Sequence, residues 1–405
     1  MLRLMRTIPT PGRRAAVALA SLALAVPAVA ACSAPATQSS ANAVKVVAST
    51  TQICDYVTQI ATGGKPDGSE TLALDRTGAD GSTTHLGPEA AKASASINLT
   101  CLLAPNASAH EHDMTAAQAR ALSEADLFLI SGVDLEHFLD DAVTSTGFKG
   151  TMVVTSGVYG AADVDDLDAQ KAKEAALPYT VERGSQKVDV APWPFAPEEG
   201  ESEPEFRFDP HVWTAPAGAM VQVRNIGEAL AKASPAGAAT INEHTEAYAG
   251  LLSELDTWAR TSLESVPADK RVLFTSHDAF GYLSKAYGLK FEGAALSDFN
   301  AQQDATAQQI QTTADAVTAS GAVAIFAENS NNPASVRKVA ETAGVKAIIG
   351  DEALYGDSLG EPGSDGETYI GSILHNVTGL TNAWGGTVAP IPASLTTWTP
   401  KAAAQ

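Results

Sequence analysis

The chain has 405 residues, with 47 Asp and Glu against 26 Lys and Arg, so its formal net charge is −21 at pH 7. This acidic balance argues against binding to nucleic acid and against adhesion to anionic lipid. The length exceeds what one typical core supports, so two domains are expected. After the N-terminal segment, no run of about eighteen consecutive apolar residues occurs, so no membrane-spanning helix is predicted there.

Residues 1–31 have the pattern of an export signal, with arginines before a short apolar run. Small residues then precede Cys32 as in a bacterial lipobox, which predicts lipidation of Cys32. An ordinary cleaved signal with an incidental cysteine is the alternative. Residues 32–43 would form a tether. We therefore expect an extracytoplasmic protein with a lipid anchor in the cell membrane. The pair Arg13-Arg14 leaves Sec and twin-arginine export both open.

With Cys32 lipidated, two cysteines remain, Cys54 and Cys101. In an exported protein, such a pair is typical of a disulfide. A cysteine-containing metal site is the alternative, although the two residues lack the close spacing of a zinc knuckle.

Alternating strand and helix patterns predict an α/β fold of two lobes, each with a parallel, doubly wound sheet. The lobes are expected over 44–234 and 267–386. A long apolar-periodic segment, 235–266, predicts one α-helix that joins them as a rigid connector of about 45 Å. Residues 387–405 are interpreted as a weakly structured tail.

Two stretches of the first lobe interrupt this alternation. Residues 62–96 are polar, Gly-rich and aperiodic, so we expect an inserted surface loop. Residues 163–207 are acidic and Pro-rich, which is typical of a flexible surface insertion.

Three histidines and one aspartate stand out by their positions. His110 and His277 follow predicted strands, and Asp357 lies in a matching loop of the second half. His211 lies between Pro210 and a Val-Trp pair interpreted as a buried strand end. Ligands of doubly wound sheets lie beyond the carboxyl ends of the strands. Taken alone, a histidine such as His110 or His277 would more often have an ordinary surface or core role than bind a metal. Together, three imidazoles and a carboxylate suit Zn²⁺, with Mn²⁺ as the alternative, in the cleft between the lobes.

The chain resembles the zinc and manganese receptors of ABC transporters, a family of solute-binding proteins with a rigid interlobe helix. The resemblance extends over about Val44–Gly385. It is carried by five stretches, Val47–Thr51, Leu103–Asp126, Asp209–Trp213, Thr275–Leu283 and Asp357–Gly363. It implies metal ligation by His110, His211, His277 and Asp357. It also implies a monomeric, non-enzymatic receptor that delivers its metal to a membrane permease with its ATPase.

The chain departs from the family pattern around the first ligand. Ser108 and Ala109 replace an Asp-Pro pair, and His112 stands where an aromatic residue is usual. We interpret His112 as a residue beside the ligands, and Glu328 as a second supporting residue. A histidine rather than a glutamate at His277 favours zinc over manganese.

Two other classes are less favoured. A secreted metalloenzyme would need an open metal position and a general base, for which Glu328 or Asp278 could serve, but the chain has no His-Glu-x-x-His helix. No sequence feature indicates an adhesin, and adhesion would not exclude metal binding.

Overall fold

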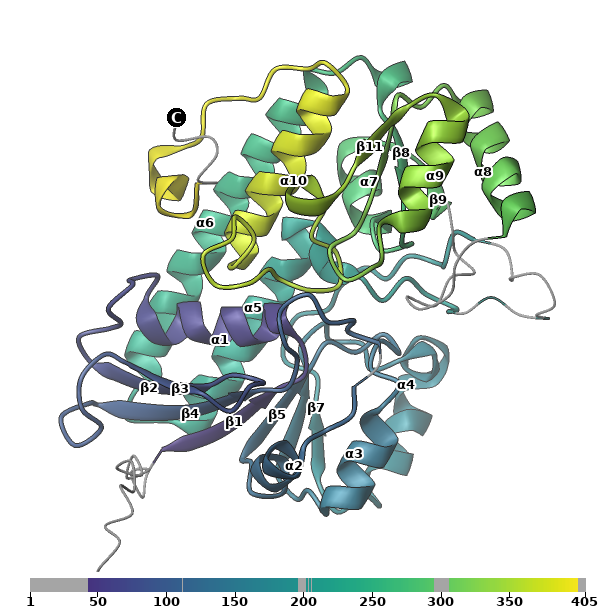
Figure 1. Cartoon of the computed structure of the whole chain (residues 1–405). Helices are drawn as coiled ribbons and strands as arrows, with labels where there is room; N and C mark the ends of the chain where they lie inside the picture. The colour runs from purple at the N-terminus through teal and green to yellow at the C-terminus, as the bar shows by residue number, and fades with distance from the viewer. Residues whose placement is uncertain are drawn as a thin grey trace, which may run out of the picture. The chain divides into compact units, whose positions relative to one another are not determined.

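The structure is a computed structural model that describes residues 43–110, 112–195, 202, 204, 206–294 and 306–399. The predicted signal, Cys32 and the last residues of the tail lie outside these ranges. The described part of the chain forms an α/β fold of two lobes with mostly parallel sheets, as expected (Figure 1).

The first lobe contains a seven-stranded sheet in the order β3-β2-β4-β1-β5-β6-β7. All neighbouring strands are parallel except β2 and β3. The strands are β1 (Val44–Ala48), β2 (Leu72–Thr77), β3 (Thr83–Leu86), β4 (Ala95–Cys101), β5 (Leu127–Ile130), β6 (Thr151–Val154) and β7 (Thr180–Glu182). The helices are α1 (Thr51–Thr62), α2 (Ala116–Ser123), α3 (Leu139–Thr146), α4 (Ala161–Glu174) and α5 (Pro216–Ala233).

Both faces of the central strands β1, β5 and β6 are largely buried, which explains why these strands are mostly apolar. Successive residues of a strand point to opposite faces. Val46 and Ala48 pack with α1, α5 and the long helix α6 (Ala238–Glu264), while Val47 packs with α2 and α3. Figure 1 shows these two groups of helices on opposite sides of the strands.

The second lobe contains a four-stranded parallel sheet in the order β11-β10-β8-β9. Its strands are β8 (Val272–Thr275), β9 (Lys290–Ala294), β10 (Ala324–Phe326) and β11 (Lys346–Ile348). Helices α8 (Ala307–Ser320) and α9 (Ala334–Ala343) pack on one face, and α7 (Gly281–Tyr287) and α10 (Tyr369–Ala383) pack on the other.

Helix α6 is the connector. Its 27 residues span about 40 Å. It contacts α1 and α5 of the first lobe and α7 and α10 of the second. Buried Tyr248, Leu252 and Leu255 recur on one side of it, and a single apolar core runs from β1 through α6 to β10. The two lobes therefore share packed side chains along the helix. Among the described helices, none combines the length and apolar character needed to cross a membrane.

The expectation of a loop over 62–96 is wrong, because β2 and β3 lie there. Strand β2 is parallel to β4, with Leu74 opposite Ile97, and β3 closes this edge of the sheet. Leu72 and Leu74 are both 1% exposed. Only a short apolar stretch marks this strand in the sequence, and its partner β4 supplies the rest of the packing.

The expectation of a flexible surface insertion over 163–207 is wrong for the first part of this stretch, which is described. Helix α4 and strand β7 occupy its first part. The buried guanidinium of Arg183 lies 2.6 Å from carboxylate oxygens of both Asp163 and Glu174. Two of the acidic residues that suggest a solvated segment are here paired with one arginine. Residues 196–201, 203 and 205 lie outside the described part.

The C-terminal tail is more ordered than expected as far as residue 399. A 3₁₀ helix covers Ala393–Trp398, and its Leu395 is fully buried. The indole Nε1 of Trp258 on α6 donates to the carbonyl oxygen of Ala389 at 2.9 Å. Apolar packing and this hydrogen bond attach the tail to the connector helix.

Candidate metal centre

His110, His211, His277 and Asp357 lie together in the structure. One potential ligand atom from each lies within 4.8 Å of the others. Nε2 of His110 is 3.2 Å from Nε2 of His211 and 3.2 Å from Oδ2 of Asp357. Oδ1 of Asp357 is 3.2 Å from Nε2 of His277 and 3.5 Å from Nε2 of His211. Segments remote in the sequence thus present three imidazoles and one carboxylate to a common point.

His110 lies in the loop that follows β4. The backbone N–H of His110 donates to Oγ of Ser108 at 3.2 Å, and that hydroxyl donates to Oδ2 of Asp357 at 3.4 Å. Ser108, which departs from the family pattern, therefore contacts a candidate ligand from the other lobe. His110 is 8% exposed.

His211 is held by the motif around it. The carboxylate oxygen Oδ1 of Asp209 accepts from the backbone N–H of His211 at 3.0 Å and lies 2.8 Å from its Nδ1. This contact turns Nε2 toward the other three side chains. The prediction that the Val-Trp pair after it forms a strand end is wrong. This pair belongs to a 3₁₀ helix, Val212–Thr214. Nε1 of Trp213 donates to the carbonyl oxygen of Gly356 at 2.9 Å, beside Asp357.

His277 lies two residues after β8. The hydroxyl of Thr275, the last residue of this strand, donates to the carbonyl oxygen of His277 at 2.6 Å. The side chain of His277 is 23% exposed, whereas those of the other three residues of the cluster are 11% exposed or less. Solvent therefore reaches the cluster most readily at His277.

Asp357 lies in the loop between β11 and α10 and is 1% exposed. Its backbone N–H donates to Oε1 of Glu328 at 3.0 Å, and the same oxygen accepts from Gly356 at 3.1 Å. Nε2 of Gln52 donates to the carbonyl oxygen of Asp357 at 3.0 Å. Groups from both lobes thus hold this loop in place.

The cluster is strongly coupled by charge. Burial alone would lower the pKa of His277, but the carboxylate of Asp357 raises it to about 10. Burial would raise the pKa of Asp357, but the imidazoles of His277 and His110 hold it well below its usual range. Burial lowers the pKa of His211. A buried anion compensated by a proton on imidazole is an arrangement in which a metal cation can replace that proton.

His112 and Glu328, the two residues expected beside the ligands, differ in their surroundings. The ring of His112 lies edge-on to Phe138, with centroids 5.6 Å apart, and burial lowers its pKa. It does not belong to the four-residue cluster. Glu328 is 1% exposed, and its hydrogen bonds hold the Asp357 loop. A supporting role remains a prediction for both.

Several contacts of the cluster were not predicted. The ring of Phe206, which is 3% exposed, has its centroid 5.5 Å from that of His110 and 6.4 Å from that of His211. Trp193 packs on the same phenylalanine. Both residues belong to the acidic insertion. Aromatic residues in an otherwise hydrophilic stretch were the available signal, whereas no sequence pattern indicated the role of Gln52.

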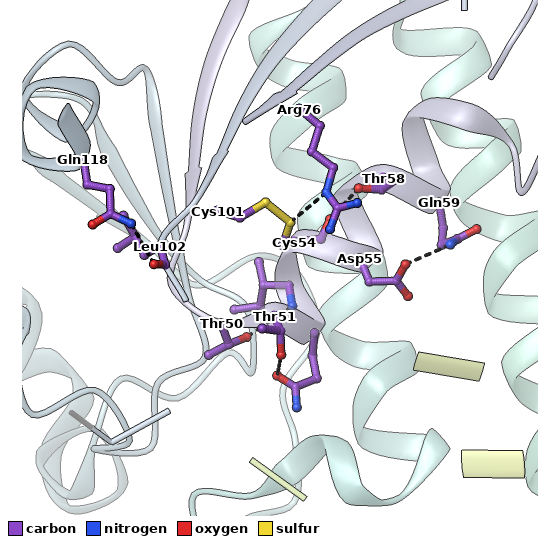
Figure 2. The surroundings of a disulfide bond; sticks show 12 residues. Thr50, Thr51, Cys54, Asp55, Thr58, Gln59, Arg76, Cys101, Leu102 and Gln118 are labelled. Carbon is purple, nitrogen blue, oxygen red and sulfur yellow. Dashed lines mark hydrogen bonds between the residues drawn. A yellow bond between two sulfur atoms is a disulfide. The ribbon is translucent and has the colours of Figure 1, made fainter. Parts of the chain in front are cut away.

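Cys54 and Cys101 form a disulfide, with Cα atoms 5.6 Å apart (Figure 2). The alternative of a cysteine-containing metal site is therefore not supported by the structure. The bridge joins the first turns of α1 to the end of β4, and Nε of Arg76 lies 3.4 Å from Sγ of Cys54.

The fold and the cluster together define a class, the two-lobed α/β receptors that bind a solute between their lobes. A protein-family model described as "ZnuA: Zinc-uptake complex component A periplasmic" matches residues 46–383. The chain belongs to this family and is the extracytoplasmic solute-binding component of a metal ABC importer. The resemblance seen in the sequence is thereby confirmed.

Individual relatives agree with this assignment. The chain is 29% identical over 284 residues to the zinc-binding protein TroA of Treponema pallidum, covering 69% of this chain and 80% of that protein. It is 28% identical over 290 residues to the manganese-binding lipoprotein MntA of Bacillus subtilis, covering 71% and 82%. A solved structure of TroA superposes with a TM-score of 0.59 at 24% identity, over 84% of this chain and 98% of that one, which supports the fold.

Proposed function

We propose that the protein captures Zn²⁺ with His110, His211, His277 and Asp357. The observation that carries this proposal is the spacing of the ligand atoms. Zinc binds imidazole nitrogen and carboxylate oxygen at about 2.0–2.2 Å, so neighbouring ligand atoms of a tetrahedral site are about 3.3–3.6 Å apart. Four contacts in the cluster measure 3.2, 3.2, 3.2 and 3.5 Å; one of them reaches Oδ2 of Asp357 and two reach its Oδ1. With one ligand atom from each residue, all four atoms lie within 4.8 Å of one another. A tetrahedral cation would therefore draw the more widely spaced side chains of this cluster inward.

The imidazole content favours zinc, because nitrogen ligands bind it more tightly than manganese. Manganese is the second candidate, and one observation supports it. Both carboxylate oxygens of Asp357 lie beside imidazoles, Oδ2 near His110 and Oδ1 near His277, so that both oxygens could enter an expanded coordination shell. The relatives include proteins named for zinc, for manganese and for iron.

We infer capture and delivery without chemistry. Four protein ligands would fill a tetrahedral zinc site and leave no position for an activated water. The loaded protein would dock as a monomer on a membrane permease that works with an ATPase. Lipid on Cys32 would keep it close to that partner, since relatives of this kind are named lipoproteins.

Isothermal titration of the purified protein with Zn²⁺ and with Mn²⁺ tests the proposal. We expect tighter binding of Zn²⁺, at one ion per chain, and a loss of at least about a hundredfold in His211→Ala, because a buried first ligand is removed. His85→Ala is the matched control, since His85 lies on β3, where it pairs with Asp75 and does not belong to the four-residue cluster. A loss below tenfold in His211→Ala would rule out the assigned ligands. Elemental analysis of protein purified from its own host would identify the metal bound in the cell.

A further inference from the structure

The disulfide lies between two segments that carry candidate ligands. Cys101 is the last residue of β4, and the chain after it forms the loop with His110. Cys54 lies in the first turns of α1, at the end that faces the second lobe's Asp357 loop. Figure 2 shows the bridge between this helix and the strand end.

The start of α1 holds the Asp357 loop through buried hydrogen bonds. The backbone N–H of Leu359 donates to the hydroxyl of Thr51 at 2.8 Å. Nε2 of Gln52 donates to the carbonyl oxygens of Asp357 at 3.0 Å and Gly356 at 3.2 Å. The position of α1 therefore determines the position of Asp357.

The His110 loop contacts the same Asp357 loop. The backbone N–H of Asn106 donates to the carbonyl oxygen of Leu359 at 3.0 Å, and the hydroxyl of Ser108 donates to Oδ2 of Asp357 at 3.4 Å. The disulfide joins α1 to the end of β4. Hydrogen bonds join α1 and the His110 loop to the Asp357 loop, so these three segments form one closed ring of contacts.

Packing around the bridge is incomplete. A cavity of about 410 Å³ is lined by both cysteines, by Leu103 on the His110 side and by Leu359 on the Asp357 side. Both cysteines also belong to the apolar core, but on the side of this cavity no packed side chains of the described residues separate the two segments, so the covalent link is the direct connection between them there.

We propose that the Cys54–Cys101 disulfide is a positioning element of the metal site. It holds the start of α1 against the end of β4, and so sets the separation between His110 and Asp357. This inference rests on the proposed metal-binding function. It assigns to the bridge a role in metal affinity and coordination geometry, in addition to any contribution to the stability of the fold.

The test compares the wild type with Cys54→Ala/Cys101→Ala. We expect the double variant to bind Zn²⁺ about tenfold more weakly, as for the loss of other groups that orient ligands. We also expect the visible absorption bands of bound Co²⁺ to shift, because they report ligand geometry. A purely stabilising bridge would change neither quantity at a temperature well below unfolding.

Phe148→Leu is the matched control. Phe148 is fully buried in the core on the opposite face of the first sheet, between β5 and α3, so its truncation destabilises the lobe away from α1. We expect both variants to lower the unfolding temperature of the metal-free protein, but only the disulfide variant to change affinity and the Co²⁺ bands. Wild-type affinity and bands in the disulfide variant would overturn the inference alone, whereas absence of metal binding by the wild type would overturn the proposed function with it.

Gln52→Met provides a second measurement, with the disulfide intact. It removes the hydrogen bonds from α1 to the carbonyls of Asp357 and Gly356. We expect a several-fold loss of Zn²⁺ affinity. In the triple variant, which adds Cys54→Ala and Cys101→Ala, the combined loss should be smaller than the product of the separate losses, because both changes disrupt the same ring of contacts. If the cysteine variant does not fold, an unchanged affinity in Gln52→Met overturns the inference.

Discussion

The carboxylate of Glu328 shows how a residue beside the cluster can control it. Both oxygens of this carboxylate accept hydrogen bonds. Oε1 accepts from the backbone N–H groups of Gly356 and Asp357. Its other oxygen receives donors from Ser330 and Asn331. Burial, followed by repulsion from Asp357, raises the pKa of Glu328. The side chain at position 328 must therefore offer two acceptor oxygens, as a carboxylate does.

We predict that Glu328→Gln weakens Zn²⁺ binding by about ten- to a hundredfold. The amide has one acceptor oxygen, so its NH₂ group would face a donor and displace the Asp357 loop. Titration calorimetry measures the effect, and Glu264→Gln, an exposed change on α6, is the control. Equal affinities of both variants and the wild type would show that Glu328 does not position Asp357.

The protonation of His277 predicts a pH dependence of metal binding. Its pKa is raised to about 10 in the metal-free protein, so it carries a proton at pH 7 to 8, whereas burial lowers the pKa of His211 and leaves that ring neutral there. Zinc requires neutral imidazole. We therefore expect His277 to release about one proton on binding, and apparent affinity to fall about tenfold for each pH unit from 9 to 7.

Calorimetry in buffers of different ionisation enthalpy counts the released protons. The variant His277→Gln provides the comparison, because it cannot carry this proton and should release fewer protons than the wild type. A wild-type protein that binds Zn²⁺ without releasing a proton at pH 8 would contradict the assignment.

At the scale of elements, the edge of the first sheet depends on β2. This strand lies between β3 and β4. Leu74 is opposite Ile97 of β4 on one side and Leu86 of β3 on the other. Its side chain is 1% exposed and belongs to the core that includes α1. Residues that look like part of a polar loop therefore support the helix that carries Thr51 and Gln52.

We predict that Leu74→Ala lowers the free energy of unfolding by about 2–5 kcal/mol, because it removes buried methyl groups and leaves a cavity. Urea unfolding followed by circular dichroism measures it. Val323→Ala is the control, since that side chain is 47% exposed and should change stability by less than about 0.5 kcal/mol. A similarly small effect of Leu74→Ala would mean that residues 72–77 are not a packed strand.

At the scale of the whole molecule, the proposed ligands belong to both lobes. His110 and His211 come from the first lobe, and His277 and Asp357 come from the second. The lobes also share one apolar core along α6. A bound metal would therefore add a direct link between parts that are already packed together, and large rigid-body motion about α6 is not expected.

We predict that Zn²⁺ stabilises the protein against unfolding by about 4 kcal/mol when free metal is a thousandfold above the dissociation constant. Thermal unfolding with Zn²⁺ and with a chelator measures the difference. The variant Asp357→Ala should show no such shift. Stabilisation of equal size in that variant would place the metal elsewhere on the molecule.

Much of the architecture and the candidate ligands could be predicted from the sequence. Alternating apolar patterns, each complete within a few residues, indicated the parallel sheets, and the apolar periodicity before Pro267 indicated α6. The ligand candidates follow from positions after strands and from motifs such as Asp209–Trp213. The disulfide was expected because only two cysteines remain after Cys32. Short sequence patterns and residue counts were enough for these predictions, so no knowledge of remote contacts was needed.

Tertiary structure decided the features that depend on remote partners. Strand β2 is stable because β4 and β3 flank it, and the first part of the acidic insertion folds where Arg183 pairs with Asp163 and Glu174. The contacts of Gln52 with the Asp357 loop join residues about 300 positions apart. The contacts of Gln52 arise only when both lobes are assembled. Hydrogen bonds and ion pairs depend on distance in space and leave no periodic pattern in the sequence.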